Sequence, residues 1–180
     1  MSEKFKFAID IDGVACAHAL SICERINSDY SLSASPEDIT TWDHDFGPIT
    51  FKQAVEKYYP DNEFIASMKV TLGFKDFFNE IKKSYTAVFA TNRKHSQEAT
   101  LKWVKENFGK DNQVYFLNDK TDLLFDYLID DYPGHVIAAA KFDRKAFLFS
   151  QPWNISDQSE VSKCEKVKIV QSFDQVLENL

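Results

Sequence analysis

Two aspartates, Asp10 and Asp12, stand one residue apart in the stretch "FAIDIDGV" at residues 7–14. The apolar run before them predicts a buried strand, and their spacing puts both carboxyl groups on one side of its end. Gly13 then permits a sharp turn. Burying two neighbouring carboxylates is unfavourable unless a positive charge compensates them. The pair is therefore either solvated in a turn or part of a metal site.

A calcium-binding EF-hand loop is one rival interpretation, and the sequence argues against it. Counted from the first aspartate, such a loop needs an oxygen ligand at its fifth position and glycine at its sixth. This chain has Val14 and Ala15 there.

More residues with chemical potential follow later apolar runs. Thr91 ends "VFAT", where its hydroxyl and the turn amides could contact a phosphate. Lys120, in "FLNDKTD", could neutralise a phosphate and stabilise transition-state charge. A second acidic pair, Asp130 and Asp131, ends "YLIDD". We expect these strand ends to converge, and a group of carboxylates requires a hard divalent cation, for which Mg²⁺ is suitable.

The segments that must position these residues alternate between strand-like and helix-like patterns. Strands are expected at residues 5–11, 85–91, 113–118, 127–131, 145–150 and 166–170. Helices are expected at residues 73–84, 96–109, 133–142 and 172–180. This alternation predicts an α/β fold with a parallel sheet flanked by helices.

Two of the expected helices have a defined apolar face. In the helix at 73–84, four residues share it: Phe74, Phe77, Phe78 and Ile81. In the helix at 96–109, three residues share it: Leu101, Val104 and Phe108. Ser96 is expected to cap the start of that second helix, and Gly109 to end it.

Residues 15–70 interrupt the pattern, because they contain helix-like segments and no good strand. Ser35, in "SASPEDIT", is expected to cap one of these helices. Ligands of open α/β sheets bind at the carboxyl edge of the strands. We therefore expect a core of residues 1–14 and 71–180, with residues 15–70 inserted after the first strand as a small helical cap over that edge.

Charge and composition exclude several classes of protein. A net charge of −7 argues against a broad nucleic-acid or anionic-membrane surface. Three cysteines, in no CxxC spacing, favour reduced thiols over a disulfide framework. The start "MSEKFKF" has no apolar signal segment, and no apolar run approaches the length of a membrane helix. We therefore expect a soluble, cytoplasmic protein.

The order DxDGV, Thr, Lys and Asp-Asp, from Asp10 to Asp131, resembles that of the haloacid dehalogenase-like (HAD) phosphatases. Within that superfamily the chain is most similar to the 5'(3')-deoxyribonucleotidases. The resemblance rests on the motifs "DIDGV", "PEDITTW", "IDDYP" and "QPWN". It implies a Rossmann-like HAD core with a helical cap.

The resemblance also implies roles for four residues. Asp10 would be the nucleophile that forms an aspartyl-phosphate. Asp12 would protonate the leaving oxygen and then activate the water that hydrolyses the intermediate. Thr91 and Lys120 would grip the phosphoryl oxygens.

The same resemblance implies a Mg²⁺ site. Its ligands would be the Asp10 carboxylate, the Asp12 backbone carbonyl and Asp131. Asp130 would lie adjacent to the ion or act in its outer sphere.

Other residues have competing interpretations. Trp42, Phe46 and Phe64, in the cap, could stack on a nucleobase or could simply form the core of the cap. Asn92 and Arg93 could bind substrate or be solvated turn residues. The four histidines are scattered without metal-ligand spacing and are expected at the surface or at helix caps: His18, His44, His95 and His135.

We therefore expect a Mg²⁺-dependent phosphomonoesterase acting on nucleoside monophosphates, above all 5'-deoxyribonucleotides. Arg93 and Lys94 leave open a 3'-phosphatase acting on nucleic-acid ends, although a small cap favours small substrates. A third alternative is a catalytically idle homologue that binds nucleotides. The expected partner is a small nucleotide, and neither extended nucleic acid nor a membrane is expected. The resemblance makes a homodimer plausible.

Overall fold

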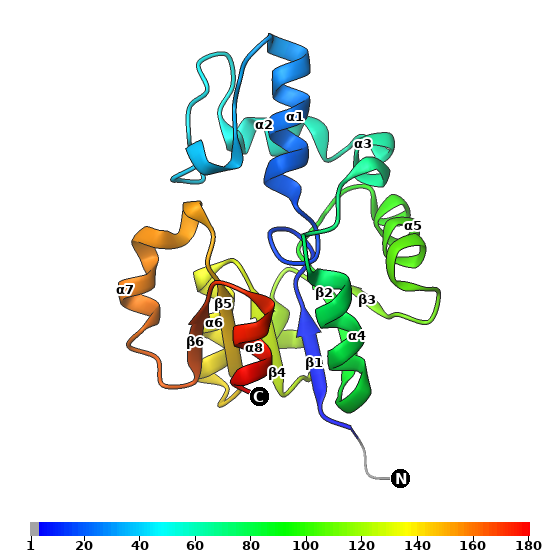
Figure 1. The fold of residues 1–180 in the computed structure, drawn as a ribbon, viewed down its shortest axis with the longest axis vertical. Coiled ribbons are helices and arrows are strands. Elements are labelled where there is room, and N and C mark those ends of the chain that lie inside the picture. The colour runs from blue at the N-terminus through cyan, green and yellow to red at the C-terminus, as the bar shows by residue number, and fades with distance from the viewer. Residues whose placement is uncertain (1–3) are drawn as a thin grey trace.

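The computed structural model describes residues 4–180, which form a six-stranded, fully parallel sheet in the order β3-β2-β1-β4-β5-β6 (Figure 1). The strands are β1 (Lys6–Ile9), β2 (Thr86–Thr91), β3 (Val114–Phe116), β4 (Tyr127–Asp130), β5 (Lys145–Phe149) and β6 (Val167–Val170). The predicted α/β fold with a parallel sheet is confirmed, and each strand lies within its expected range.

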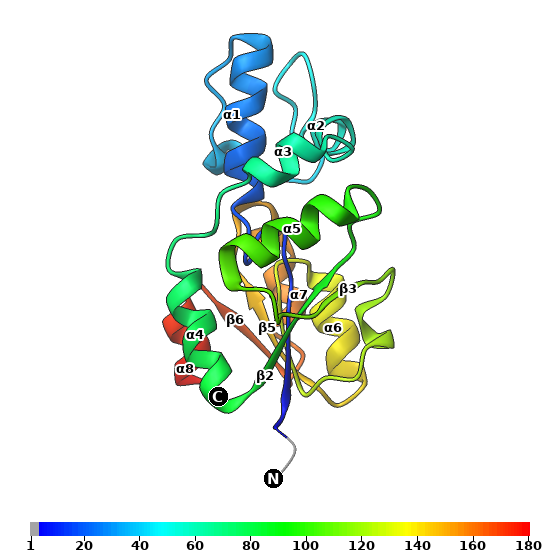
Figure 2. The same cartoon turned by 90° about the vertical axis from the view of Figure 1, so that its right-hand side faces the viewer.

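Helices cover both faces of the sheet (Figures 1 and 2). One face packs against α4 (Phe74–Ser84), α5 (Gln97–Phe108) and α8 (Phe173–Glu178). The other packs against α6 (Pro133–Lys141) and α7 (Gln158–Val161). Because both faces are covered, the central strands are buried along most of their length, which explains their continuous apolar sequences.

The predicted apolar face of α4 is buried, and its phenylalanines pack against Phe89, Phe108 and Phe173. For α5 the prediction is partly wrong. Leu101 is 45% exposed, because the buried face is centred on Thr100 and Trp103 instead.

Ser96 is the N-cap residue of α5, as predicted, but its side chain does not cap the helix. Its backbone is left-handed, with φ of 54°, and its side chain makes no capping bond. Its hydroxyl instead donates to the Tyr59 carbonyl at 2.8 Å, which joins the start of α5 to the segment between α2 (Phe51–Tyr58) and α3 (Asn62–Ser67). Ser35 precedes a 3₁₀ turn at Pro36–Asp38, where its N–H donates to the Asp38 carboxylate.

Residues 15–70 contain α1 (His18–Tyr30), α2 (Phe51–Tyr58) and α3 (Asn62–Ser67), beyond the carboxyl end of the strands (Figure 1). All of these residues are described, and they form no strand beyond isolated bridges. That they make up a separate cap domain stays a prediction.

Two short segments connect these helices to the rest of the chain, and they are bonded to each other. Ala17 N–H donates to the Lys69 carbonyl at 2.9 Å, and Thr71 N–H donates to the Ala15 carbonyl at 3.0 Å. Between these bonds, Cys16 and Val70 form an antiparallel bridge. The two connections, residues 15–17 and 69–71, therefore form a short two-stranded ribbon, hereafter the hinge ribbon.

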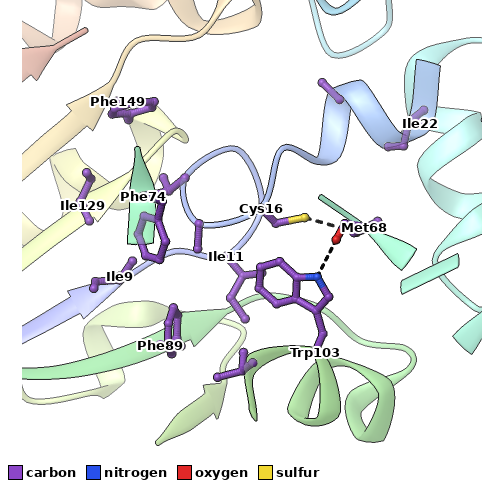
Figure 3. Packing of buried hydrophobic residues seen from close by; sticks show 14 of the residues in the cluster. Ile9, Ile11, Cys16, Ile22, Met68, Phe74, Phe89, Trp103, Ile129 and Phe149 are labelled. Atoms are coloured by element: carbon purple, nitrogen blue, oxygen red, sulfur yellow. Dashed lines mark hydrogen bonds between the residues drawn. The ribbon is translucent and has the colours of Figure 1, made fainter. Parts of the chain in front are cut away.

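Met68 anchors the hinge ribbon to the core (Figure 3). The indole N–H of Trp103, on α5, donates to the Met68 carbonyl at 2.7 Å, and the Cys16 Sγ lies 3.5 Å from the Met68 Sδ. All three side chains are buried.

Across residues 4–180, no helix combines the length and apolarity that membrane crossing requires.

Candidate active site

The turn after β1 requires a glycine at position 13. Gly13 has φ of +79°, in the left-handed region, and a Cβ built there would lie 2.2 Å from Asp131 Oδ2. Asp10 and Asp131 flank this turn from neighbouring strands, β1 and β4. Glycine therefore allows the second acidic pair to approach the first closely.

Three buried carboxylates meet at this edge of the sheet. Asp10, Asp130 and Asp131 each offer an oxygen within 4.8 Å of the others. Lys120 is also buried and donates to both Asp10 and Asp130, the latter at 2.6 Å. The structure thus brings together the residues expected from three separate stretches of sequence.

One lysine does not neutralise this cluster. Burial raises the pKa of Asp10 to about 7, against the opposing charge of Lys120. Burial, together with the charges of Asp10 and Asp130, raises the pKa of Asp131 well above its usual range. A divalent cation would relieve both effects, and carboxylate oxygens are the ligands that Mg²⁺ prefers. The donor set therefore fits the metal that the sequence suggested.

Asp130 is bonded mainly within the protein. Its Oδ2 accepts from Lys120 and lies 2.9 Å from His135 Nδ1, while its Oδ1 accepts from the Tyr132 N–H at 2.9 Å. Burial alone would raise its pKa, but Lys120 and His135 outweigh burial and lower the pKa to about 2. Asp130 therefore holds Lys120 in place, and Asp10 and Asp131 have more free lone pairs for a metal.

Side chains of the "QPWN" turn, residues 151–154, donate hydrogen bonds to both acidic turns of the site. Trp153 Nε1 donates to Asp131 Oδ2 at 2.8 Å, and Asn154 Nδ2 donates to the Asp131 carbonyl at 2.7 Å. Gln151 Nε2 donates to the Gly13 carbonyl at 2.7 Å. The sequence marked this motif as part of a family resemblance but assigned it no function, and the structure shows that it positions Asp131.

Arg93 forms a two-point ion pair with Asp12. Its Nε and Nη2 donate to the two Asp12 carboxylate oxygens at 2.8 and 2.6 Å. Burial alone would raise the pKa of Asp12, but the charge and hydrogen bonds of Arg93 outweigh burial and lower the pKa to about 2. The expectation that Arg93 could be a solvated turn residue is wrong, because its guanidinium is buried and bonded to Asp12, and a contact with substrate stays a prediction.

The Arg93 guanidinium also contacts α5 and residues of the 15–70 segment. Nη1 donates to Thr100 Oγ1 on α5 at 3.0 Å. Nη2 lies 3.2 Å from the Met68 Sδ, and the Tyr59 ring stacks with its centroid 5.3 Å from the guanidinium carbon. Arg93 thus fixes Asp12 while it joins residues 15–70 to the core.

Of the two residues before Arg93, Thr91 is buried and Asn92 is exposed. Thr91 is buried at the end of β2, and its Oγ1 accepts from the Arg93 N–H at 3.2 Å. Asn92 is exposed, and its side-chain amide donates to the Asn118 carbonyl at 3.4 Å. Both border the cavity described next.

A cavity of about 820 Å³ lies between the carboxyl edge of the sheet and residues 15–70. Trp42 and Trp153 provide aromatic walls. Its acidic lining residues outnumber its lysines and arginines by six to three. The acidic ones are Asp10, Asp12, Glu56, Asp130, Asp131 and Asp157, and the basic ones are Arg93, Lys94 and Lys120. This excess of negative charge also favours a cation in the site.

Two predicted cap contacts do not reach the cavity. Phe64 is 5% exposed and packs on Tyr58 within residues 15–70, and Phe46 packs edge-on against His44. Neither borders the cavity, and their apolar area is used for packing within residues 15–70. Their role in base stacking therefore stays a prediction that this geometry does not favour. Trp42 does border it, 45% exposed and edge-on to Phe51.

Sequence reasoning also missed residues of the site. His18 was expected at a surface or cap, but it is buried and borders the cavity. His135 and Tyr59 border it as well. The spacing of the histidines in the sequence could not predict the positions of His18 and His135, because only the folded chain brings them to the cavity.

The fold is similar to that of one class of solved structures, the HAD-like hydrolases. A haloacid dehalogenase-like hydrolase family protein from Streptococcus pneumoniae superposes with a TM-score of 0.68 at 13% identity, covering 99% of each chain. An HAD family hydrolase from Deinococcus radiodurans, solved with bound phosphate and sodium, gives 0.62 at 11% identity, covering 98% of this chain and 94% of that one. These likenesses show an HAD-like fold.

The sequence narrows this class to one family. Residues 5–177 match the family described as "5' nucleotidase, deoxy (Pyrimidine), cytosolic type C protein", and the chain belongs to it. This membership confirms the resemblance inferred from the motifs and makes the protein a phosphoric monoester hydrolase of the 5'-nucleotidase type. No curated protein matches the sequence.

Proposed function

We propose that this protein is a Mg²⁺-dependent phosphomonoesterase that hydrolyses nucleoside monophosphates and prefers 5'-deoxyribonucleotides. The observation that carries the proposal is the meeting of Asp10, Lys120 and Asp131 on one wall of a cavity that Trp42 borders. The cavity volume lies in the range of about 300–1,000 Å³ usual for small-molecule sites. A small phosphorylated ligand with an aromatic base suits such a site.

Two carboxylates divide the chemistry. Asp10 attacks phosphorus, the ester P–O bond breaks, and an aspartyl-phosphate forms. Asp12 must first take up a proton, giving up part of its pairing with Arg93, and it passes that proton to the departing ester oxygen; the ionised Asp12 then takes a proton from the water that hydrolyses the intermediate. Arg93 positions Asp12 at two points and favours its ionised form, which is the form that accepts the proton from water.

Lys120 and the metal site manage the negative charge. Lys120 lies against the nucleophile and compensates charge as the phosphoryl group transfers, and Thr91 offers a hydroxyl to the phosphoryl oxygens. The Asp10 and Asp131 carboxylates and the Asp12 carbonyl would hold Mg²⁺. When bound, the ion would polarise the phosphoryl group and reduce repulsion between it and Asp10.

A 3'-phosphatase acting on nucleic-acid ends is the second candidate. This alternative rests on two basic residues, Arg93 and Lys94. Arg93 is paired with Asp12, whereas Lys94 is exposed and borders the cavity. We also propose a cytoplasmic location, in line with the cytosolic type named in the family description. A homodimer stays a prediction.

The test is phosphate release with Mg²⁺ from 5'- and 3'-monophosphates, deoxy and ribo, and from a 3'-phosphorylated oligonucleotide. Asp10→Asn is the control, because it keeps the shape of the side chain and removes the nucleophile. We expect fastest release from deoxynucleoside 5'-monophosphates and no release by Asp10→Asn. Release from the oligonucleotide alone would reassign the function to end repair, and no release from any substrate would favour the idle homologue.

Mg²⁺ is expected to stabilise the protein more near pH 8 than near pH 5. The pKa of Asp10 is raised to about 7 and that of Asp131 is also raised, so protonated carboxyls stabilise the metal-free fold at low pH. That contribution is lost as the pH rises through about 7, and the metal no longer has to displace protons. Thermal unfolding with Mg²⁺ or with a chelator, at both pH values, measures the effect.

An equal Mg²⁺-induced rise in melting temperature at both pH values would contradict this prediction. Asp131→Asn is the matched control: it removes one proposed ligand and should abolish most of the rise at the higher pH.

Trp153→Phe is expected to raise the Mg²⁺ concentration that gives half-maximal activity about tenfold. The phenyl ring keeps the packing against His18 and Phe51, but the hydrogen bond that orients Asp131 is lost. Mg²⁺ titrations of phosphate release measure this. Trp42→Phe is the control, since the Trp42 indole makes no bond to the acidic cluster, and it should leave the Mg²⁺ dependence unchanged.

A further inference from the structure

His18 is buried at the start of α1 without a hydrogen-bond partner. The residue is 1% exposed, yet it borders the cavity. Neither ring nitrogen, Nδ1 or Nε2, is bonded to any group in residues 4–180. The ring packs against both Phe51 and Trp153, at centroid distances of 5.7 and 5.2 Å, and those two rings are stacked 6.1 Å apart.

An unpartnered imidazole in such a place is costly. Burying a polar group without a partner costs about 1–3 kcal/mol, so almost all buried polar atoms in folded proteins are bonded. An aromatic hydrocarbon side chain would fill the space beside Phe51 and Trp153 without this cost. A role in packing therefore does not explain a histidine here, whereas a ligand in the cavity could supply the missing partner.

The position of His18 indicates which part of a nucleotide lies beside it. His18 is close enough to Asp12 for the charge of that carboxylate to act on the imidazole. Asp12 serves the ester oxygen, and in a nucleotide the sugar directly follows that oxygen. Trp42, at the exposed rim, is the aromatic surface available to the base.

We propose that His18 is a specificity-determining residue that hydrogen-bonds the sugar hydroxyl not occupied by the phosphate, which is the 3'-hydroxyl of a 5'-nucleotide. This inference rests on the nucleotidase activity proposed above. Because the ring nitrogens are closed to solvent before the ligand binds, a small rotation of the imidazole accompanies binding.

The chemistry of the imidazole matches a hydroxyl. Burial lowers the pKa of His18 to about 4, although the Asp12 charge opposes this, so the ring is neutral near pH 7. A neutral imidazole has one donor nitrogen and one acceptor nitrogen, and a hydroxyl can pair with either. No charge is required of the ligand.

The experiment compares two substrates with the same base: a 2'-deoxynucleoside 5'-monophosphate and its 2',3'-dideoxy analogue. We expect the wild-type protein to prefer the hydroxyl-bearing substrate about tenfold in kcat/KM, since a lost partner leaves the imidazole unpaired. In His18→Phe this ratio should fall to nearly 1. His18→Asn, whose amide can also donate and accept, should retain part of the preference.

Phe51→Leu is the matched control, because it changes packing against the same ring and leaves the imidazole in place. It should keep the wild-type ratio. A wild-type ratio near 1, an unchanged ratio in His18→Phe, or an equal loss on both substrates would overturn the role of His18 alone. A wild-type protein without activity on either nucleotide would overturn the proposed function as well.

Discussion

Lys120→Met is expected to reduce phosphate release by about 10³-fold and to destabilise the metal-free protein. The ammonium group is buried against Asp10 and Asp130, and Asp131 lies in the same cluster. Without it, the transferring phosphoryl group meets uncompensated carboxylates, and removing one such preorganised charge has effects of about this size.

The same change leaves Asp10 and Asp130 buried without their cation. Breaking a buried ion pair from one side costs about 3–5 kcal/mol of unfolding free energy. The loss should be smaller near pH 5 than near pH 8: without Lys120 the carboxyl pKa values rise, and the protonated forms remain stable in the fold at low pH.

Urea unfolding in a chelator at both pH values measures the stability, and phosphate release measures the activity. Lys94→Met is the matched control, because this lysine also borders the cavity but is exposed. It should have little effect on stability. A Lys120→Met protein as stable and active as the wild type would show that the cluster does not depend on this cation.

Arg93→Met is expected to lower kcat/KM for a nucleoside monophosphate about 10²-fold, and much less for p-nitrophenyl phosphate. Arg93 holds both oxygens of Asp12, and general acid catalysis of this kind contributes about 10²–10⁴-fold. The alkoxide of a sugar must be protonated as it leaves, whereas p-nitrophenolate leaves without a proton. Misplacing Asp12 therefore affects the first substrate selectively.

The pH dependence of kcat gives a second readout for Arg93. Arg93 lowers the pKa of Asp12 to about 2, so its loss raises that pKa. Asp12 must be ionised to activate water in the second step, and the acidic limb of the profile should move to higher pH. A merely structural defect would slow both substrates equally without this shift.

Two variants separate the contacts of Arg93. Arg93→Lys keeps the charge but loses the two-point geometry, and it should restore only part of the activity. Thr100→Val removes a different bond of the same guanidinium and leaves Asp12 untouched, so it should preserve the ratio between the two substrates. Equal slowing of both substrates by Arg93→Met would rule out a positioning role.

The sequence predicted which residues cluster at the carboxyl edge of the sheet, because the strand topology is simple there. Asp10, Thr91 and Asp130 follow or end strands β1, β2 and β4, which are neighbours in one parallel sheet. Strand ends in such a sheet share an edge, so a linear order of motifs becomes a cluster in space. The family resemblance then added chemical roles to positions that the pattern had already grouped.

The direction of individual side chains could not be predicted in the same way. Arg93 follows Thr91 in a loop, where no periodicity predicts whether the guanidinium faces the cavity or packs against residues 15–70. Phe46 and Phe64 have the same side chain whether they stack on a base or fill a core. His18 reaches the site only because α1 begins at the hinge ribbon.

The hinge ribbon links the helices above the cavity to the catalytic turn itself. Cys16 bridges Val70, and its N–H donates to the Ile11 carbonyl at 2.7 Å, while its carbonyl accepts from Gly13 at 3.0 Å. Interactions that the helices make with the non-reacting part of a substrate are therefore transmitted to the residues flanking Asp12. Under the proposed nucleotidase activity, binding energy gained far from phosphorus would then help to orient the acid–base group, and we expect small phosphate esters that lack a nucleoside to lose turnover as well as affinity.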